Sequence, residues 1–499
     1  MLETIREFAT TRLIAAGARG EALDAQTAWA LGLAERYGVR LMVAEDQVSL
    51  VDRLVREENN LTDVLRRALE ARDRPGVARL VALLGGLWTI TGDQPRVYAV
   101  ADAAEEVLTG WEIPTDLLDA AREAAGVLMV HLSWMPGQDL GALRALLVQG
   151  DAPPLAGTWA RIAHAVLVAD DPPGATRRLS AWARLEPEGA SAAVLLLWAA
   201  IAAENEGDID GATRYAQEAL TYDDLSPFLV ASLHAELSQL AMTLGDHRAA
   251  ARHATLAWPS LVRLHSKSDA LSMRVATVLA PLADGDTDAA EAILHELAPP
   301  DDLRMQLGAG LSWRSAHAEI SLARGDVAEG LRRYDAGVDV LLATDDAGAG
   351  VSPWLMLAAA AALVAHIRYA TGSPDPRTDE LRDLLLGSMP PGDDASLWFT
   401  DLPLNGVLLV GLAAWSLRHG PTEGHEDACR LLAIAQRWAC NRSLPVMAWP
   451  PLLTLADEAL PGRVGSLLVE YADRPGRSLL PEAAAAVERL RGSCVTSSG

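Results

Sequence analysis

Aromatic residues are scarce in this chain of 499 residues: they make up 5% of the sequence, and only three are phenylalanine. Half of the residues are nevertheless hydrophobic, and most of these are alanine and leucine. Alanine and leucine lose little on entering a helix, whereas sheets favour β-branched and aromatic side chains. The composition therefore predicts an almost entirely α-helical protein. Its length exceeds what one globular core usually holds, so we expect several domains or an elongated solenoid.

Lysine is nearly absent, since Lys267 is the single one in the sequence. The chain has 42 basic and 67 acidic residues, which gives a formal net charge of −25. A surface of that sign repels phosphate backbones and anionic lipids. We therefore expect neither nucleic acid nor a membrane to bind this chain directly.

Cysteine is also rare, with Cys429, Cys440 and Cys494 only. The first two are eleven residues apart in a helix-like run, roughly 16 Å along the axis, which is too far for a disulfide. Free thiols of this kind suit a reducing cytosol. No signal peptide opens the sequence, and the longest uncharged apolar runs are about a dozen residues, short of the ~20 that a membrane span needs. We expect a cytoplasmic protein.

The dipeptide Gly-Asp recurs with a near-constant period in the middle of the chain. The four copies lie at 207–208, 245–246, 285–286 and 325–326. Self-similarity at a period of 20–50 residues is typical of a repeat array. In each unit, glycine can end one helix in the left-handed conformation, and aspartate can cap the next helix. The alternative is ordinary helix–helix turns in a bundle without repeats.

A small residue follows each of these glycines by five positions: Ala212, Ala250, Ala290 and Gly330. Small side chains there let the two helices of a hairpin approach closely. Together with the period, this predicts an all-α, tetratricopeptide-like helical-hairpin repeat solenoid with a right-handed superhelix.

Several short motifs near the N-terminus carry a resemblance to a known family. They are Met-Leu-Glu-Thr-Ile-Arg-Glu-Phe-Ala at 1–9, Leu-Ala-Glu at 33–35, Arg-Leu-x-x-Glu-x-Asn-Asn-Leu at 53–61, Ala-Leu-Glu at 68–70 and Leu-Trp at 87–88. Over about residues 1–110 the chain resembles the large nucleotide-switch (STAND, NB-ARC type) transcriptional regulators of bacteria, including the SARP and large LuxR-like members. In that family a winged-helix segment is followed by a tetratricopeptide-like sensor array.

The resemblance implies an ATP-binding module upstream of this chain. No Gly-x-x-x-x-Gly-Lys-Ser/Thr motif is present, because Lys267 has no glycine nearby. The C-terminus has no helix-turn-helix pattern. We therefore expect the sensor part alone, with no cofactor in this chain and ATP bound only in the upstream domain.

Three regions follow from the resemblance and the repeats. Residues 1–45 are expected to be a remnant of the winged helix and linker helices, and residues 46–343 the repeat array. Residues 344–499 are expected to be divergent helical repeats with a Pro/Gly-rich loop at 371–403, where Pro390-Pro391-Gly392 is the strongest turn signal.

Residues that could carry chemistry are few and scattered. His425 and Cys429 are four apart on one helical face and could bind a metal, but no further ligands cluster there, so a packed cysteine beside a surface histidine is the favoured interpretation. Gly308-Ala-Gly310 lacks the third glycine of a dinucleotide loop, and no Gly-x-Ser-x-Gly elbow occurs. The sequence therefore predicts no catalytic or metal site and no enzyme.

The candidate binding surface comes from repeat geometry. In tetratricopeptide arrays the first helix of each hairpin lines the concave face, where extended partners bind. The residues expected on this face are Glu204, Asn205, Gln239, Met242, Ser312, Ser315 and Glu319. A peptide, a protein or a small effector could bind there, although a solvated face without function is an equal alternative.

These expectations combine into one function. We expect a non-enzymatic sensor and protein-interaction region of an ATP-dependent bacterial transcriptional regulator, in which effector or partner binding regulates the nucleotide switch of an upstream NB-ARC-type domain. A free-standing tetratricopeptide scaffold is the first alternative. An enzyme with an α-helical repeat fold is the second.

Overall fold

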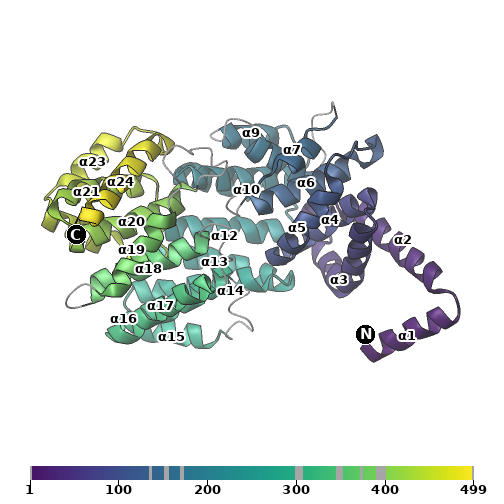
Figure 1. The fold of residues 1–499 in the computed structure, drawn as a ribbon, viewed down its shortest axis with the longest axis horizontal. Helices are drawn as coiled ribbons and strands as arrows, with labels where there is room; N and C mark the ends of the chain where they lie inside the picture. Colours follow the sequence, from purple (N-terminus) through teal and green to yellow (C-terminus); the bar gives the residue numbers. More distant parts are fainter. Residues whose placement is uncertain are drawn as a thin grey trace. The chain divides into compact units, whose positions relative to one another are not determined.

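The regular secondary structure of the described residues is entirely helical. The computed structural model describes residues 3–133, 138–150, 157–168, 174–297, 307–343, 352–370, 375–388 and 401–496, and no strand occurs in them. The prediction of an all-α helical-repeat fold is confirmed. The chain divides into two compact units (Figure 1). Unit 1 comprises Met1–Trp134, Gln138–Asp170 and Ser226–Phe228, and unit 2 comprises Met135–Gly137, Asp171–Leu225 and Leu229–Gly499.

Unit 1 is built from antiparallel helices around α4, which is buried along almost its whole length. Helices α3 and α6 both pack on α4, and α8 packs on α6. The bounds are α1 Glu3–Ala15, α2 Arg19–Tyr37, α3 Gln47–Glu70, α4 Arg74–Ile90, α5 Gln94–Leu108, α6 Leu118–Leu132, α7 Gly141–Leu147 and α8 Thr158–Ala163, with short turns η1 Leu41–Val43, η2 Thr115–Leu117 and η3 His164–Val168.

Unit 2 is a succession of helical hairpins. Within it α10 packs on α11, α16 on α17 and α20 on α21. The bounds are α9 Gly174–Ala183, α10 Gly189–Asn205, α11 Ile209–Ala219, α12 Pro227–Thr243, α13 His247–Arg263, α14 Lys267–Ala283, α15 Thr287–His295, α16 Leu307–Ala323, α17 Val327–Leu342, α18 Pro353–Tyr369, α19 Pro376–Ser388, α20 Leu402–His419, α21 His425–Arg437, α22 Trp449–Ala459, α23 Arg463–Tyr471 and α24 Leu480–Thr496, with turns η4 Thr422–Gly424, η5 Pro445–Met447 and η6 Gly476–Leu479.

The four Gly-Asp pairs form four copies of one turn. Each glycine is left-handed, with φ between +74° and +83°, a conformation that costs glycine little. The N–H of each following aspartate donates to the carbonyl five residues earlier at 2.8–2.9 Å, which satisfies a free carbonyl at the end of the first helix. Each aspartate side chain then accepts a hydrogen bond of 2.9–3.2 Å from an amide in the first turn of the second helix. The predicted turn chemistry is confirmed at all four sites.

The small residues after these turns are buried at the hairpin contacts. Ala212, Ala250 and Ala290 have no exposed surface. At Gly330 a Cβ atom would lie 2.6 Å from the side chain of Leu322, so no larger residue fits without a shift. The close approach of paired helices that the sequence predicted is therefore present.

Helix α19 lies inside the stretch 371–403 that we expected to be a Pro/Gly-rich loop. Pro376 takes the first helical position, where its missing N–H is harmless, and Leu381 and Leu385 bury one face of the helix. For residues 376–388 the loop prediction is wrong, because apolar spacing outweighed the flanking prolines. The strongest turn signal, at 390–392, lies outside the described residues.

The first helices of the hairpins, α10, α12, α14, α16, α18 and α20, form a continuous layer, called here the first-helix layer. Helix α14 packs on α16, α16 on α18, and α18 on α20. Helices α12 and α14 share an apolar core, and a hydrogen bond between the carboxyl groups of Glu204 and Glu236 links α10 to α12. Because α20 also packs on α10, the layer closes on itself within unit 2.

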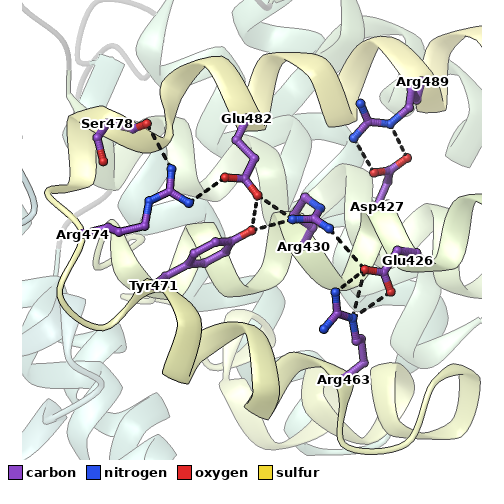
Figure 2. Close-up of polar contacts among 9 residues, drawn as sticks. All are labelled: Glu426, Asp427, Arg430, Arg463, Tyr471, Arg474, Ser478, Glu482 and Arg489. Atoms are coloured by element: carbon purple, nitrogen blue, oxygen red, sulfur yellow. Dashed lines mark hydrogen bonds and ion pairs between the residues drawn. The ribbon is translucent and has the colours of Figure 1, made fainter.

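A network of charged side chains joins the last helices of unit 2 (Figure 2). The Arg430 guanidinium on α21 donates to the Tyr471 hydroxyl at 2.9 Å and also contacts Glu482 on α24. Glu426 on α21 pairs with Arg463 at the start of α23, where the Arg463 Nε atom donates to Glu426 Oε2 at 2.8 Å. Each charge in this network has an opposite partner, so the network ties α21, α23 and α24 together.

None of the described helices is both long enough and apolar enough to cross a membrane.

Candidate functional site

A ten-residue segment of the chain lies along the first-helix layer. This crossing segment, Ala439–Ala448, connects α21 to α22 and contains only the single turn η5. It begins against α20, where a Cβ atom placed on Gly406 would lie 2.6 Å from the Cβ atom of Cys440. The Asn441 N–H donates to the Pro403 carbonyl at 3.2 Å, also on α20. The segment then reaches three further helices of the layer.

Glu319 on α16 binds the main chain of the crossing segment. Its Oε1 atom accepts a hydrogen bond from the Val446 N–H at 2.8 Å and another from the Tyr334 hydroxyl at 2.7 Å. Glu319 is 3% exposed. Burial raises the pKa of its carboxyl group to about 6, against the opposing effect of these hydrogen bonds and of nearby Arg368. The ionised form is thus held by groups on α17, α18 and the segment itself.

Arg368 on α18 binds the same part of the segment from the carbonyl side. Its Nη1 atom donates to the Pro445 carbonyl at 3.0 Å and also contacts the Val446 carbonyl. One carboxylate and one guanidinium therefore pair with the N–H and C=O groups at 445–446. Such main-chain pairing is how many domains bind extended peptides, because it works for most side chains.

Arg442 attaches the beginning of the segment to α12. Its Nε atom donates to the Thr243 carbonyl at 3.2 Å, and its guanidinium lies over the Trp449 ring, 5.5 Å from the centroid. Burial lowers the pKa of this guanidinium. The segment thus has polar contacts with α12, α16, α18 and α20.

Apolar side chains of the segment fill the space beneath it. Leu444, Val446 and Met447 are 7%, 0% and 1% exposed, while Pro445 is half-buried. They belong to the apolar core that includes residues of α16, α18 and α20. The contact therefore combines main-chain hydrogen bonds with buried apolar anchors.

The seven residues predicted for the concave face all lie on first helices, but they do not form one surface. Glu204, Gln239 and Ser312 are half-buried, whereas Asn205, Met242, Ser315 and Glu319 are buried. Met242 is part of an apolar cluster shared with α14, and the Ser312 hydroxyl donates to the Gly308 carbonyl of its own helix. Glu319 is the member of this set that forms a hydrogen bond with the crossing segment.

The other acidic residue of the predicted set, Glu204, belongs to a separate cluster. Its carboxyl group is hydrogen-bonded to that of Glu236 on α12, and Asp401, which caps α20, is close enough to interact. Burial, followed by the neighbouring negative charges, raises the pKa of Glu204 well above its usual value. Burial also raises the pKa of Glu236 to about 7 and that of Asp401 to about 6. The cluster therefore holds protons near neutral pH.

Sequence reasoning missed most of the residues that contact Glu319. Arg368 carried one signal, because it ends the otherwise uncharged helical run from Trp354 to Ile367 and a charge there needs a partner. Val446 carried no signal, since nothing local shows that its amide meets a carboxylate 127 positions earlier in the sequence.

The thiol and imidazole groups considered as metal ligands do not form a metal site. Cys429 and Cys440 are free and buried, and burial raises the pKa of their thiols to about 11 and about 12. Over the described residues, no group of three or more histidine, cysteine, aspartate or glutamate side chains is arranged to bind a metal. The interpretation of Cys429 as a packed cysteine agrees with its burial.

No protein-family model matches the chain, and no curated protein matches its sequence. Among solved structures, the crystal structure of Rap protein complexed with competence and sporulation factor is similar over 82% of this chain and 99% of that chain, with 10% sequence identity and a TM-score of 0.43. The function therefore has to come from the geometry of the chain itself.

Proposed function

We propose that this chain is a protein-interaction protein whose first-helix layer binds a short polypeptide segment. The observation that carries the proposal is the paired contact at 445–446, where Glu319 accepts from a main-chain N–H and Arg368 donates to main-chain carbonyls. Contacts with main-chain groups can recognise a polypeptide segment whatever most of its side chains are, and buried side chains beside them add selectivity. In the structure the polypeptide bound there belongs to the chain itself.

We further propose that the array is the sensor region of a nucleotide-switch transcriptional regulator. The support is the N-terminal resemblance over about residues 1–110, together with the helical hairpins that follow. Partner or effector binding on the array would then change the ATP-bound state of an upstream NB-ARC-type domain, and by linkage ATP would change the affinity for the partner. In this proposal ATP binds only to the upstream domain.

Helix α1 offers a surface for that coupling. Its described side chains, from Phe8 onward, are all exposed, and Phe8 and Ile14 are 66% and 56% exposed although both are apolar. An exposed apolar helix beside an ordered helical unit is a common feature of interaction sites. Contact with a neighbouring domain would cover these residues.

The DNA directly upstream of the Met1 codon tests the regulatory context. An in-frame P-loop domain there supports the nucleotide switch, and ATP hydrolysis by the joined protein should then respond to Glu319→Gln but not to Glu423→Gln. Glu423 is exposed and has no contact with the crossing segment, which makes it a matched control. An intergenic start with its own promoter contradicts the regulator and leaves a free-standing interaction scaffold.

A further inference from the structure

The surface proposed to bind a partner is already occupied by the crossing segment. Residues 439–448 contact four first helices, and Glu319 and Arg368 are both used in these contacts. A partner segment that uses the same two side chains cannot bind until the crossing segment leaves. Occupation of the surface is therefore a direct barrier to binding.

The crossing segment is held largely as a separate peptide would be. Its internal main-chain hydrogen bonds are local, from Met447 to Leu444 and from Ala448 to Pro445, while Asn441 and Val446 donate main-chain bonds to the array. At its start, Ala439 and Cys440 donate to carbonyl groups of α21. Helix α21 has anchors of its own. The Trp438 indole donates to the Gly476 carbonyl at 2.7 Å, and α21 is tied to α23 and α24 by the network in Figure 2. Release of the segment does not require these anchors to break.

We infer that the crossing segment is an internal ligand that blocks the array. Its partner would carry a stretch of the same chemistry, in which a leucine and a proline precede two further apolar residues, bound at its main chain by Glu319 and Arg368. This inference rests on the proposed interaction function. It identifies the class of ligand and assigns the control of partner binding to the crossing segment.

Tethering makes the block effective. A segment joined to its site by short connections competes at an effective concentration of the order of millimolar. If the crossing segment itself has micromolar intrinsic affinity for the array, a partner peptide would bind the intact chain about a thousandfold more weakly than it binds an unblocked array. A second event that loosens residues 439–448 would restore binding.

The test uses a fluorescent peptide with the sequence of residues 441–449, Asn-Arg-Ser-Leu-Pro-Val-Met-Ala-Trp. Its binding is measured by anisotropy to the wild-type chain and to a linker variant, in which residues 442–447 are replaced by an equal number of glycines and serines. The linker variant should bind at least a hundredfold more tightly than wild type. Glu319→Gln in the linker variant should weaken binding about tenfold, whereas Glu423→Gln should not, and a scrambled peptide should not bind.

The outcomes separate the block from the interaction function. Equal, measurable binding to both chains overturns the block but supports recognition by the array. A folded linker variant that does not bind the peptide overturns both. If the linker variant does not fold, Leu444→Ala replaces it, because that change removes one buried anchor of the segment. This variant should bind the peptide more tightly than wild type, and unchanged affinity overturns the inference.

Discussion

The Glu319 carboxylate accepts a hydrogen bond from the main-chain N–H of Val446 at 2.8 Å, although 127 residues separate the two positions. Both groups are buried, so the Val446 N–H depends on the Glu319 carboxylate for a partner. Arg368 completes the arrangement by donating to the carbonyl groups at 445 and 446. This contact relates the architecture of unit 2 to its proposed function, because an array that binds a segment of its own chain has the groups needed to bind another.

Removing the Glu319 carboxylate should destabilise unit 2. In Glu319→Leu the Val446 amide and the Tyr334 hydroxyl lose their acceptor, and a buried group without a partner costs about 1–3 kcal/mol. Glu319→Gln keeps an acceptor oxygen and should cost less. Denaturant unfolding gives these differences, with Glu423→Gln as a control expected within about 0.5 kcal/mol of wild type. A Leu variant as stable as the control would show that the contact adds nothing.

The capping aspartates of the Gly-Asp turns should each contribute to stability. Asp286→Ala removes the acceptor for the Ala289 amide, 3.0 Å away, and should cost about 1 kcal/mol. Asp93 provides a comparison, because it precedes α5 at the equivalent position but its side chain accepts no cap bond and pairs with Arg96 instead. Thermal unfolding should therefore show a smaller loss for Asp93→Ala. Equal losses would mean that the cap bond is not the cause.

The acidic cluster should make the protein less stable as pH rises. The folded-state pKa values of Glu236 and Asp401, about 7 and about 6, lie above their ordinary values of 4.5 and 3.8. The folded state therefore binds more protons than the unfolded state. The contribution of these groups to the free energy of unfolding is fully present below about pH 4 and is lost as pH rises to about 7. Glu236→Gln should flatten this slope in melting temperatures measured from pH 4 to pH 8. An unchanged slope would contradict the assignment of this pH dependence to the acidic cluster.

Two histidines should produce the opposite trend at acidic pH. The Nδ1 atoms of His234 on α12 and His253 on α13 are 3.1 Å apart. Burial lowers the pKa of both imidazoles from 6.5, and the adjacent His253 lowers that of His234 further. Protonation is thus disfavoured in the folded state, so this stability is present above pH 6.5 and lost below it. His253→Gln should reduce the loss of stability between pH 6.5 and pH 5, measured by melting temperatures over that range. A variant that loses as much stability as wild type would contradict the role of this histidine pair.

The repeat turns could be predicted from sequence because their chemistry is local. A glycine that tolerates positive φ, an aspartate that caps a helix and a small residue five positions after the glycine are close together in the chain, and Gly285-Asp286 with Ala290 shows all three. The regular spacing of the Gly-Asp pairs then predicts a helical-hairpin repeat fold. Both predictions need only residues that are close together in the sequence and the spacing between the repeats.

The binding surface could be predicted only in part, because it depends on contacts between distant residues. Repeat geometry placed Glu319 on a first helix but could not show that residues 439–448 cover it. Met242 was expected on a surface, yet it packs against α14 in an apolar cluster. The packing of α20 on α10, which closes the layer, joins helices about 200 residues apart in the chain, and no local motif indicates such a contact.

Hydrogen exchange of the wild-type chain tests most directly whether the crossing segment is a ligand or a fixed part of the core. Peptides that cover residues 440–448 are compared with peptides that cover the buried helix residues 358–367. If the segment is an internal ligand, its Val446 amide should exchange through local opening, at a free energy clearly below that of α18 and with little dependence on denaturant. Equal protection of the two regions, with both opening only on global unfolding, would contradict this account.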